Sequence, residues 1–158
     1  MLTVSPNDLI QTLKGETLRV RTGLWLAPKR ILGCEADEAT RLNIDAVDLR
    51  QPLLSSLPNG AQFLGLSADK IIQLFDVVCQ TAQGSECLLV FNLDLLLSRL
   101  RQQERDWVWS QMYNGFPHRS RALLLLMPAE ARHLIPPLET LRVWQADKRL
   151  AVESDFNL

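Results

Sequence analysis

The chain has 158 residues, of which 47% are hydrophobic and 22% are charged, with a formal net charge of −1 and an isoelectric point near 6.1. This composition is typical of a globular protein, excludes a disordered chain, and gives no overall positive charge to drive nucleic-acid binding. The length suits one domain. We expect a single domain over 1–158, with an N-terminal helix at 7–14, a core at 18–152 and a tail at 153–158.

The three cysteines are an odd number and form no CxxC pair. We therefore expect neither disulfides nor a zinc site, and we interpret Cys79 and Cys87 as small core residues. His118 and His133 have no acidic or cysteine cluster at metal-ligand spacing, so we expect no metal. The N-terminus lacks the pattern of a secretory signal, and no apolar run reaches the ~20 residues of a membrane span. The sequence predicts a soluble, cytoplasmic protein without membrane association.

The first half of the chain alternates between helix and strand. Ser5-Pro6-Asn7-Asp8 has the residues of a helix start, with Ser5 as the N-cap, and a short helix follows over 7–14. Hydrophobic spacing and turn residues place the next elements. They are a strand over 18–26, a helix over 35–42, a strand over 44–49, a helix over 50–57, a short strand over 62–66 and an amphipathic helix over 68–81.

Two uninterrupted apolar runs mark the second half. CLLVF at Cys87–Phe91 and RALLLLM at Arg121–Met127 are too short for helices and lack period-two alternation. Each predicts a strand buried on both faces, and we take Cys87–Phe91 as the central strand of a parallel sheet. Between them we expect one continuous helix over 95–113, with Leu100 and Trp107 facing the sheet. After them we expect a short helix over 129–135, a strand over 141–144, and a strand over 148–152 that returns as the other arm of a hairpin.

The alternation of strands and helices with short connections favours an α/β domain. We expect a mainly parallel central sheet of about five strands with helices on both faces. In such sheets, polar residues at the carboxyl end of a central strand lie where ligands bind, and Asn92 and Asp94 occupy that place. Their plainer interpretation is a helix start, with Asp94 capping the helix that follows.

The middle of the chain resembles a known fold family. A long apolar strand ending in Asn-x-Asp, then a helix and a second apolar strand, looks like the middle of a P-loop NTPase of the AAA+ or RecA-like type. The resemblance covers roughly 18–150. It implies that Cys87–Phe91 carries the Walker B acid, that Arg121–Met127 ends at the sensor position, and that 27–33 lies at the phosphate-binding loop. A Rossmann-like domain without nucleotide ancestry has the same pattern of elements.

The motifs that would support nucleotide chemistry are missing. A phosphate loop is GxxxxGKS or GxxxxGKT, whereas APKRILGCEAD has one glycine, and its Lys29 and Arg30 come too early. Asn92 stands at the Walker B acid position and, being neutral, is a poor partner for Mg²⁺. We therefore expect a degenerate member that does not hydrolyse nucleotide and has no catalytic residues and no cofactor. The candidate vestigial nucleotide site is Lys29, Arg30, Asn92 and Asp94.

A second feature is a mixture of basic and aromatic residues near the predicted helix over 95–113. Its members are Arg99, Arg101, Arg105, Trp109, Tyr113, His118, Arg119 and Arg121. Such mixtures hold single-stranded nucleic acid by charge and stacking, and the same residue types are enriched at protein interfaces. The plainer interpretation is a solvated helix face with buried aromatic side chains.

These features lead to three functional hypotheses. The first is a non-catalytic accessory subunit with a degenerate NTPase-like fold that binds protein partners or itself. By fold analogy alone, such small proteins resemble accessory factors of bacterial DNA-recombination and anti-phage defence systems. The second is a nucleic-acid-binding accessory protein that uses the surface from Arg99 to Arg121. The third is a divergent nucleotide-binding enzyme that uses Asp94 and Lys29.

Overall fold

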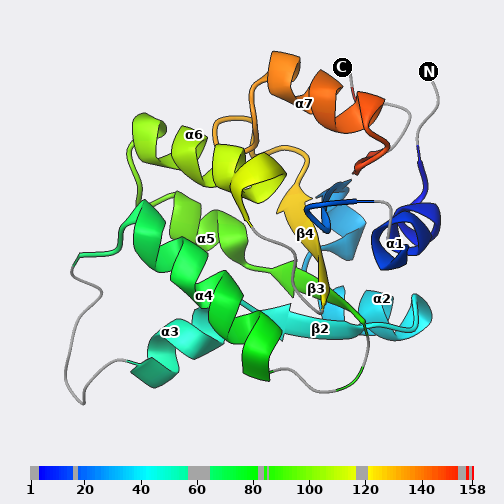
Figure 1. Cartoon of the computed structure of the whole chain (residues 1–158), viewed down its shortest axis with the longest axis horizontal. Coiled ribbons are helices and arrows are strands. Elements are labelled where there is room, and N and C mark those ends of the chain that lie inside the picture. Colours follow the sequence, from blue (N-terminus) through cyan, green and yellow to red (C-terminus); the bar gives the residue numbers. More distant parts are fainter. Residues whose placement is uncertain are drawn as a thin grey trace.

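The computed structural model describes residues 4–15, 18–56, 65–81, 84, 86–116, 121–152, 156 and 158. These residues form a five-stranded parallel sheet in the order β2-β3-β4-β1-β5, with helices on both faces (Figure 1). The predicted fold class is therefore confirmed. The strands are β1 (Thr22–Ala27), β2 (Asp45–Asp48), β3 (Cys87–Phe91), β4 (Ala122–Pro128) and β5 (Leu150–Val152).

The helices that follow or precede these strands are mostly short. They are α1 (Pro6–Lys14), α2 (Glu35–Arg41), α3 (Arg50–Ser56), α4 (Ala68–Thr81), α5 (Leu93–Leu97), α6 (Gln102–Ser110) and α7 (Leu138–Ala146). A 3₁₀ turn, η1 (Lys29–Ile31), and a π-helical turn, η2 (Gln111–Gly115), complete the described elements. The predicted α1, α2, β2, α3 and α4 agree with the structure to within one or two residues. The predicted strand over 62–66 lies mostly outside the described residues.

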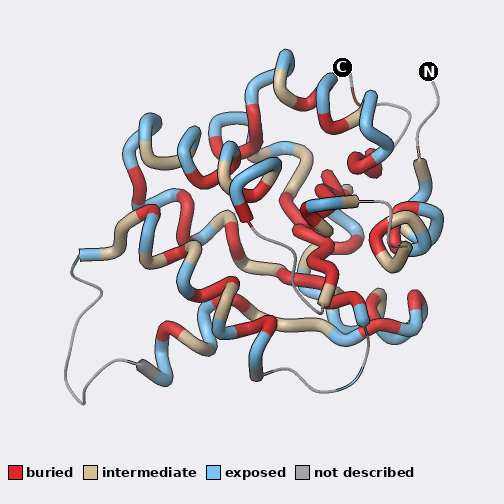
Figure 2. The backbone as a smooth tube through the Cα atoms, viewed as in Figure 1, coloured by how far each residue is buried: buried red, intermediate tan, exposed pale blue. Residues whose placement is uncertain are grey.

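The continuous apolar runs fill both sides of the sheet, as predicted. In β4, Leu123 and Leu125 belong to the core on one face, whereas Leu124 and Leu126 belong to the core on the other. Figure 2 shows β3 and β4 as buried along most of their length. The middle strand is β4, not Cys87–Phe91 as predicted. β3 is still an interior strand, because it pairs with both β2 and β4.

The two faces carry different helical layers. Side chains of α1 and α2 pack into one core cluster, and those of α3 to α7 pack into the other. α1 approaches β1 closely because Gly23 has no side chain: a Cβ there would lie 3.0 Å from Leu13 Cδ1. The start of α1 is capped as expected, with the Asp8 N–H donating to Ser5 Oγ at 3.1 Å.

The strand order creates a crossing point in the middle of the sheet. β1 pairs with β4 on one side and with β5 on the other. After β1 the chain passes β4 and β3 to reach β2, whereas after β4 it passes β1 to reach β5. The chain therefore leaves these two neighbours toward opposite edges. In open α/β sheets, ligand crevices form outside the carboxyl ends of strands at such a point.

The predicted continuous helix over 95–113 is wrong. The structure has α5, a turn over 98–101, α6 and η2 instead. Ser98 Oγ donates to the Leu95 carbonyl at 2.7 Å, and the N–H of Leu100 donates to a carbonyl only three residues back. This tightened turn lets Leu100 enter the core, as predicted. Trp107 does not face the sheet but is 41% exposed.

Two predictions near the C-terminus are also wrong. The segment 129–135 forms turns and not a helix. The predicted strand over 141–144 is part of α7, whose N-cap is Pro137, and Leu141 and Trp144 are buried at helical spacing. β5 lies parallel to β1, so it is not the arm of a hairpin.

The cysteines behave as packing residues where they are buried. Cys79 and Cys87 lie in the core, as predicted, and Cys34 is exposed. Burial raises the pKa of the Cys87 thiol to about 12, so this thiol stays protonated at neutral pH. Within the part of the chain that the structure describes, no helix combines the length and the apolar character needed to cross a membrane.

Candidate functional site

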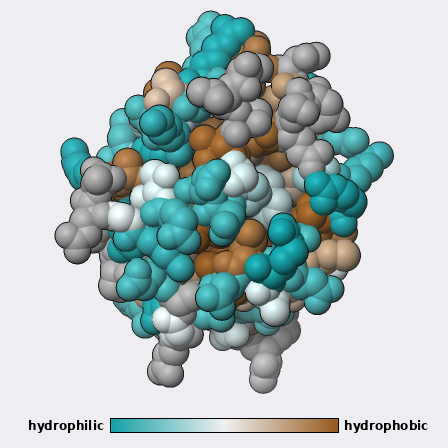
Figure 3. All heavy atoms as spheres, turned by 90° about the vertical axis from the view of Figure 1, so that its right-hand side faces the viewer, coloured by the Kyte–Doolittle hydropathy of each residue, from teal (hydrophilic) through white to brown (hydrophobic). Residues whose placement is uncertain are grey.

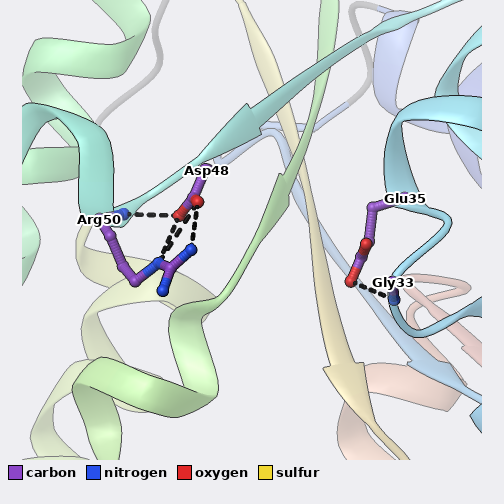
Figure 4. Close-up of polar contacts among 4 residues, drawn as sticks. All are labelled: Gly33, Glu35, Asp48 and Arg50. Atoms are coloured by element: carbon purple, nitrogen blue, oxygen red, sulfur yellow. Dashed lines mark hydrogen bonds and ion pairs between the residues drawn. The ribbon is translucent and has the colours of Figure 1, made fainter.

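The turn after β1 lies where the resemblance places a phosphate loop. The backbone N–H groups of Ile31, Leu32 and Cys34 each donate to a carbonyl three residues earlier, at 2.9 to 3.1 Å. The N–H of Gly33 donates to Glu35 Oε1 at 3.1 Å (Figure 4). Four consecutive N–H groups are thus used within the segment itself. A phosphate loop needs such groups to point at the ligand, whereas these four donate within the turn itself.

The start of α2 carries its own negative charges. Glu35, Asp37 and Glu38 all lie in its first turn. Acidic side chains stabilise a helix N-terminus, and here they have the role that a bound phosphate has at such a terminus. A phosphate at this position would meet these carboxylates.

The two cations that follow β1 do not complete the predicted site. Lys29 Nζ pairs with Glu130 Oε2 at 3.4 Å, and Glu130 follows β4. Arg30 is exposed in η1. Lys29 therefore forms a link between the ends of β1 and β4.

Asn92 is held by a neighbouring strand end. It has left-handed backbone dihedrals, with φ at 64°, where β3 turns into α5, and asparagine tolerates this region better than most residues. Its side chain donates to the carboxylate of Asp48, the last residue of β2. Asp48 also accepts the Arg50 N–H at 3.0 Å and the Arg50 guanidinium at 2.9 Å (Figure 4). Asn92 thus completes the partners of a structural ion pair.

The charge of Asp48 is fixed by these contacts. Burial opposes its ionisation, but hydrogen bonds from Arg50 and Asn92 outweigh burial and hold the pKa of Asp48 below its usual value. Because the folded pKa is lowered, the stability from this carboxylate is present above its unfolded pKa. It is lost as the pH falls through the folded value.

Asp94 lies in the first turn of α5 and not at the N-cap, which is Asn92. Burial raises its pKa, and hydrogen bonds from the N–H groups of Asp94 itself and Leu95 oppose the rise. The charges of Glu35 and Arg50 also act on this pKa, in opposite directions. The prediction that Asp94 caps this helix is therefore wrong, because Asp94 lies two residues after the N-cap.

The polar residues at this edge of the sheet form paired contacts rather than an open site. Figure 4 shows the Asp48–Arg50 contact and the Gly33–Glu35 contact at separate places. Among the described residues, no three His, Cys, Asp or Glu side chains lie together in a way that could hold a metal ion. The chemistry that this arrangement supports is charge pairing within the fold.

Replacing Asn92 with aspartate, the residue of a Walker B strand, is expected to lower the free energy of unfolding by about 2 kcal/mol at neutral pH. The substitution removes the hydrogen bond to Asp48 and places a second carboxylate beside it. Repulsion raises the folded pKa of this pair above the unfolded value. The loss is therefore largest near pH 7 and shrinks as the pH falls toward about 4.5.

Urea unfolding at the two pH values measures this dependence. Asn92→Gly is the matched control, because glycine accepts the left-handed backbone and removes the hydrogen bond without adding charge. The free energy of unfolding that Asn92→Gly loses should be the same at both pH values. If the aspartate variant also loses the same amount at both, charge repulsion with Asp48 is not the cause.

The basic and aromatic residues predicted as an interaction surface do not all lie at the surface. Trp109 is 2% exposed, and its Nε1 donates to the Leu134 carbonyl at 2.9 Å. Tyr113 packs edge-on against Trp144 and donates its hydroxyl to Asp147. The structure therefore does not place Trp109 on an accessible surface.

Two of the cations in this group form contacts with residues nearby in the sequence. Arg101 Nε approaches Glu104 Oε1 at 3.4 Å, and Arg105 donates to the Leu100 carbonyl and to Gln102. Arg99 is exposed, and Arg121 is half-buried just before β4. His118 and Arg119 lie outside the described residues.

The structure adds residues that the sequence did not single out. Glu35, Asp48 and Arg50 join Asn92 and Asp94 at the carboxyl edge of the sheet. One signal was available: Asp48 lies at the end of the predicted strand over 44–49, Asn92 follows the predicted strand Cys87–Phe91, and carboxyl ends of parallel strands lie at one edge of a sheet. No protein-family model matches the chain, and no curated protein or solved structure matches it either.

Proposed function

We propose that this chain is a non-catalytic interaction subunit with a degenerate P-loop NTPase-like fold. The observation that carries the proposal is the turn after β1. Its four consecutive N–H groups at 31–34 all donate within the segment, one of them to the carboxylate of Glu35. A turn whose N–H groups at 31–34 already have partners within the segment, one of them the carboxylate of Glu35, is poorly suited to hold a nucleotide phosphate.

Two further contacts support the loss of nucleotide chemistry. Asn92 donates to Asp48, so its side chain has a structural partner. Lys29, the cation nearest to a phosphate-loop lysine in the sequence, is paired with Glu130. The arrangement of the strands remains consistent with a P-loop-like sheet, because β1 is paired with β4, the strand that the resemblance makes the sensor strand.

The distribution of exposed apolar side chains supports a role in binding proteins. Large hydrophobic side chains with 41 to 48% exposure occur on α3 to α7, within the described residues. They are Leu54, Val77, Leu95, Trp107, Leu138 and Val143. All belong to the helices that cover one face of the sheet. On the side that carries α1, hydrophobic residues show only as separate patches between hydrophilic ones (Figure 3).

The α3–α7 layer is therefore the face that we assign to a protein partner or a second copy. Tryptophan is among the residues that contribute most to interfaces, and Trp107 lies beside a hollow lined by Asp69, Gln103 and Glu104. Acidic and amide groups around an aromatic anchor are typical of an interface with a polar rim.

Calorimetric titration with ATP and GTP, with and without Mg²⁺, tests the first half of the proposal. We expect no saturable heat and no shift in the thermal unfolding midpoint at nucleotide concentrations of about 1 mM. Saturable binding that is lost in Lys29→Ala would show that the turn does hold a nucleotide and would overturn the proposal. Nucleotide hydrolysis above the buffer rate would do the same.

Light scattering after size-exclusion chromatography, together with capture from the native lysate, tests the second half. Trp107→Asp on α6 should abolish self-association or the capture of a defined partner. Gln11→Asp, an exposed position on α1, is the matched control and should leave it intact. The proposal fails if the protein is monomeric and captures nothing, or if both variants have the same effect.

A further inference from the structure

A cavity of about 260 Å³ opens at the carboxyl ends of β1, β4 and β5. It lies beside the two strands from which the chain leaves toward opposite edges, which is where open α/β sheets bind ligands. It is separate from the Asp48–Arg50 contact at the β2 end of the sheet. None of the residues discussed for nucleotide chemistry except Lys29 lines it.

The floor of this cavity is apolar and firmly held. Leu26 of β1, Val152 of β5 and Phe156 are 0%, 7% and 8% exposed. They come from two segments that are far apart in the sequence, β1 and the stretch from β5 to Phe156, so the floor exists only in the folded protein. A buried apolar floor with a few polar groups at its edge is the usual form of a small-molecule site.

The rim carries two cations and one anion. Lys29 and Glu130 pair with each other at 3.4 Å across the mouth. Arg132 is exposed, and its guanidinium lies over the Phe156 ring, 4.7 Å from the ring centroid. Stacking on the ring orients the plane of the guanidinium, and its N–H groups then form a fork suited to a carboxylate. Because Lys29 and Glu130 offset each other, the rim keeps one net positive charge.

We propose that this cavity binds a small, singly charged carboxylate with a compact apolar or aromatic body. The carboxylate pairs with Arg132, and the body rests on the floor of Leu26, Val152 and Phe156. The volume corresponds to about nine water molecules, which suits a ligand of roughly ten non-hydrogen atoms. The carboxylate of Glu130 at the rim disfavours ligands with several negative charges, such as nucleoside triphosphates. This ligand site goes beyond the interaction role and does not depend on it.

The same chemistry has two sources, a free small acid or the C-terminal residue of a polypeptide. Phenylacetate represents the first, and the peptide Gly-Gly-Phe with a free carboxylate represents the second. Their amides, 2-phenylacetamide and the C-terminally amidated peptide, keep the apolar body and lack the charge. Ligand-observed NMR with the full chain compares the four probes.

We expect phenylacetate, the free peptide, or both to bind with a dissociation constant of roughly 1 mM or below. The amides should bind at least about tenfold more weakly, because they cannot form the charged pair with Arg132. Binding of the peptide alone assigns the site to a polypeptide C-terminus, and binding of phenylacetate alone assigns it to a free acid. The proposal is overturned if neither acid binds up to about 10 mM, or if the amides bind equally well.

Two substitutions at the rim should act in opposite directions. Arg132→Gln should weaken binding at least about tenfold, whereas Glu130→Gln should strengthen it about threefold, with both effects smaller at high salt. Arg142→Gln, an exposed position on α7, is the matched control and should change nothing. Thermal unfolding checks that each variant is folded. If Arg132→Gln fails to fold, the rise in Glu130→Gln and the amide comparison still decide, and a fall in Glu130→Gln overturns the assignment.

Competition with ATP distinguishes a failure of the carboxylate site from a failure of the proposed function. If phenylacetate binds and ATP does not displace it, the pocket is assigned whatever the outcome of the nucleotide titrations. If ATP displaces phenylacetate with a lower dissociation constant, the cavity is a nucleotide site. Both the carboxylate assignment and the non-catalytic role then fail, which the titrations with Lys29→Ala would show independently.

Discussion

Replacing Trp109 with alanine is expected to lower the free energy of unfolding by about 4 kcal/mol. The indole is 2% exposed in the core under α6, and its Nε1 donates to the Leu134 carbonyl at 2.9 Å. The substitution removes a large buried apolar surface, leaves a cavity and takes away the partner of a buried carbonyl. Urea unfolding with linear extrapolation measures the loss.

Trp107 provides the control on the same helix. It lies two positions earlier and is 41% exposed, so Trp107→Ala should cost less than about 1 kcal/mol. Equal losses in the two variants would mean that the side chain of Trp109 is not buried as described. The two tryptophan variants also test the hypothesis that this surface binds nucleic acid. Reduced oligonucleotide binding in Trp109→Ala would report unfolding, whereas a reduction in Trp107→Ala or Arg99→Gln would report contact.

The sequence predicted well those elements whose signal lies within one short stretch of residues. CLLVF and RALLLLM are apolar without interruption because both faces of β3 and β4 are covered. Ser5, Pro6 and Asp8 form a local start signal, and α1 begins where they place it. These elements needed no knowledge of the rest of the chain.

The predictions of secondary structure failed where contacts between distant parts of the chain decide the local structure. Four residues, Leu141 to Trp144, are too few to separate a strand from a helix, and the spacing of Leu141 and Trp144 becomes helical only within α7. The turn over 98–101 interrupts a good helical pattern, and Leu100 is buried there as it would be in a continuous helix, so its apolar spacing does not reveal the break. Propensity alone does not reveal either outcome.

The candidate site was predicted only in part for the same reason. Asn92 and Asp94 were found because they follow a recognisable strand. Asp48 and Arg50 became relevant only when β2 was placed beside β3, which depends on pairing between distant segments. The cavity at Arg132 depends on three strand ends and on Phe156, so no single stretch of the sequence contains it.

Arg149 is a buried arginine, with 5% of its surface exposed. Its Nε donates to the Thr22 carbonyl at 2.8 Å, and a terminal nitrogen donates to Thr22 Oγ1 at 2.6 Å. The guanidinium also stacks on the rings of Tyr113 and Trp144, at 4.6 and 4.8 Å from their centroids. One side chain therefore joins the start of β1, the turn η2, helix α7 and strand β5.

The π-helical turn η2 is part of the same network. The Met112 carbonyl accepts a hydrogen bond from the Thr22 hydroxyl and is within 3.5 Å of Arg149. A carbonyl released from regular α-helical bonding is available for such contacts. The unusual turn and the buried arginine thus satisfy each other's polar groups.

Replacing Arg149 with methionine is expected to lower the free energy of unfolding by about 3 kcal/mol, and the thermal midpoint by about 6–12 °C. Methionine keeps much of the buried volume, so the loss measures the hydrogen bonds to Thr22 and the stacking on the two rings. The change leaves the Thr22 carbonyl without its side-chain donor. Calorimetry and urea unfolding on the purified protein measure both quantities.

Arg149→Lys distinguishes shape from charge. Lysine keeps a positive charge but lacks the planar fork that reaches two oxygens of Thr22 while stacking on Tyr113 and Trp144. It should therefore lose nearly as much stability as methionine, whereas Arg142→Met on the exposed side of α7 should lose less than about 0.5 kcal/mol. A lysine variant as stable as the wild type would show that charge alone suffices at this position. If instead both variants lose stability, the planar guanidinium is what ties the last strand of the sheet to its first.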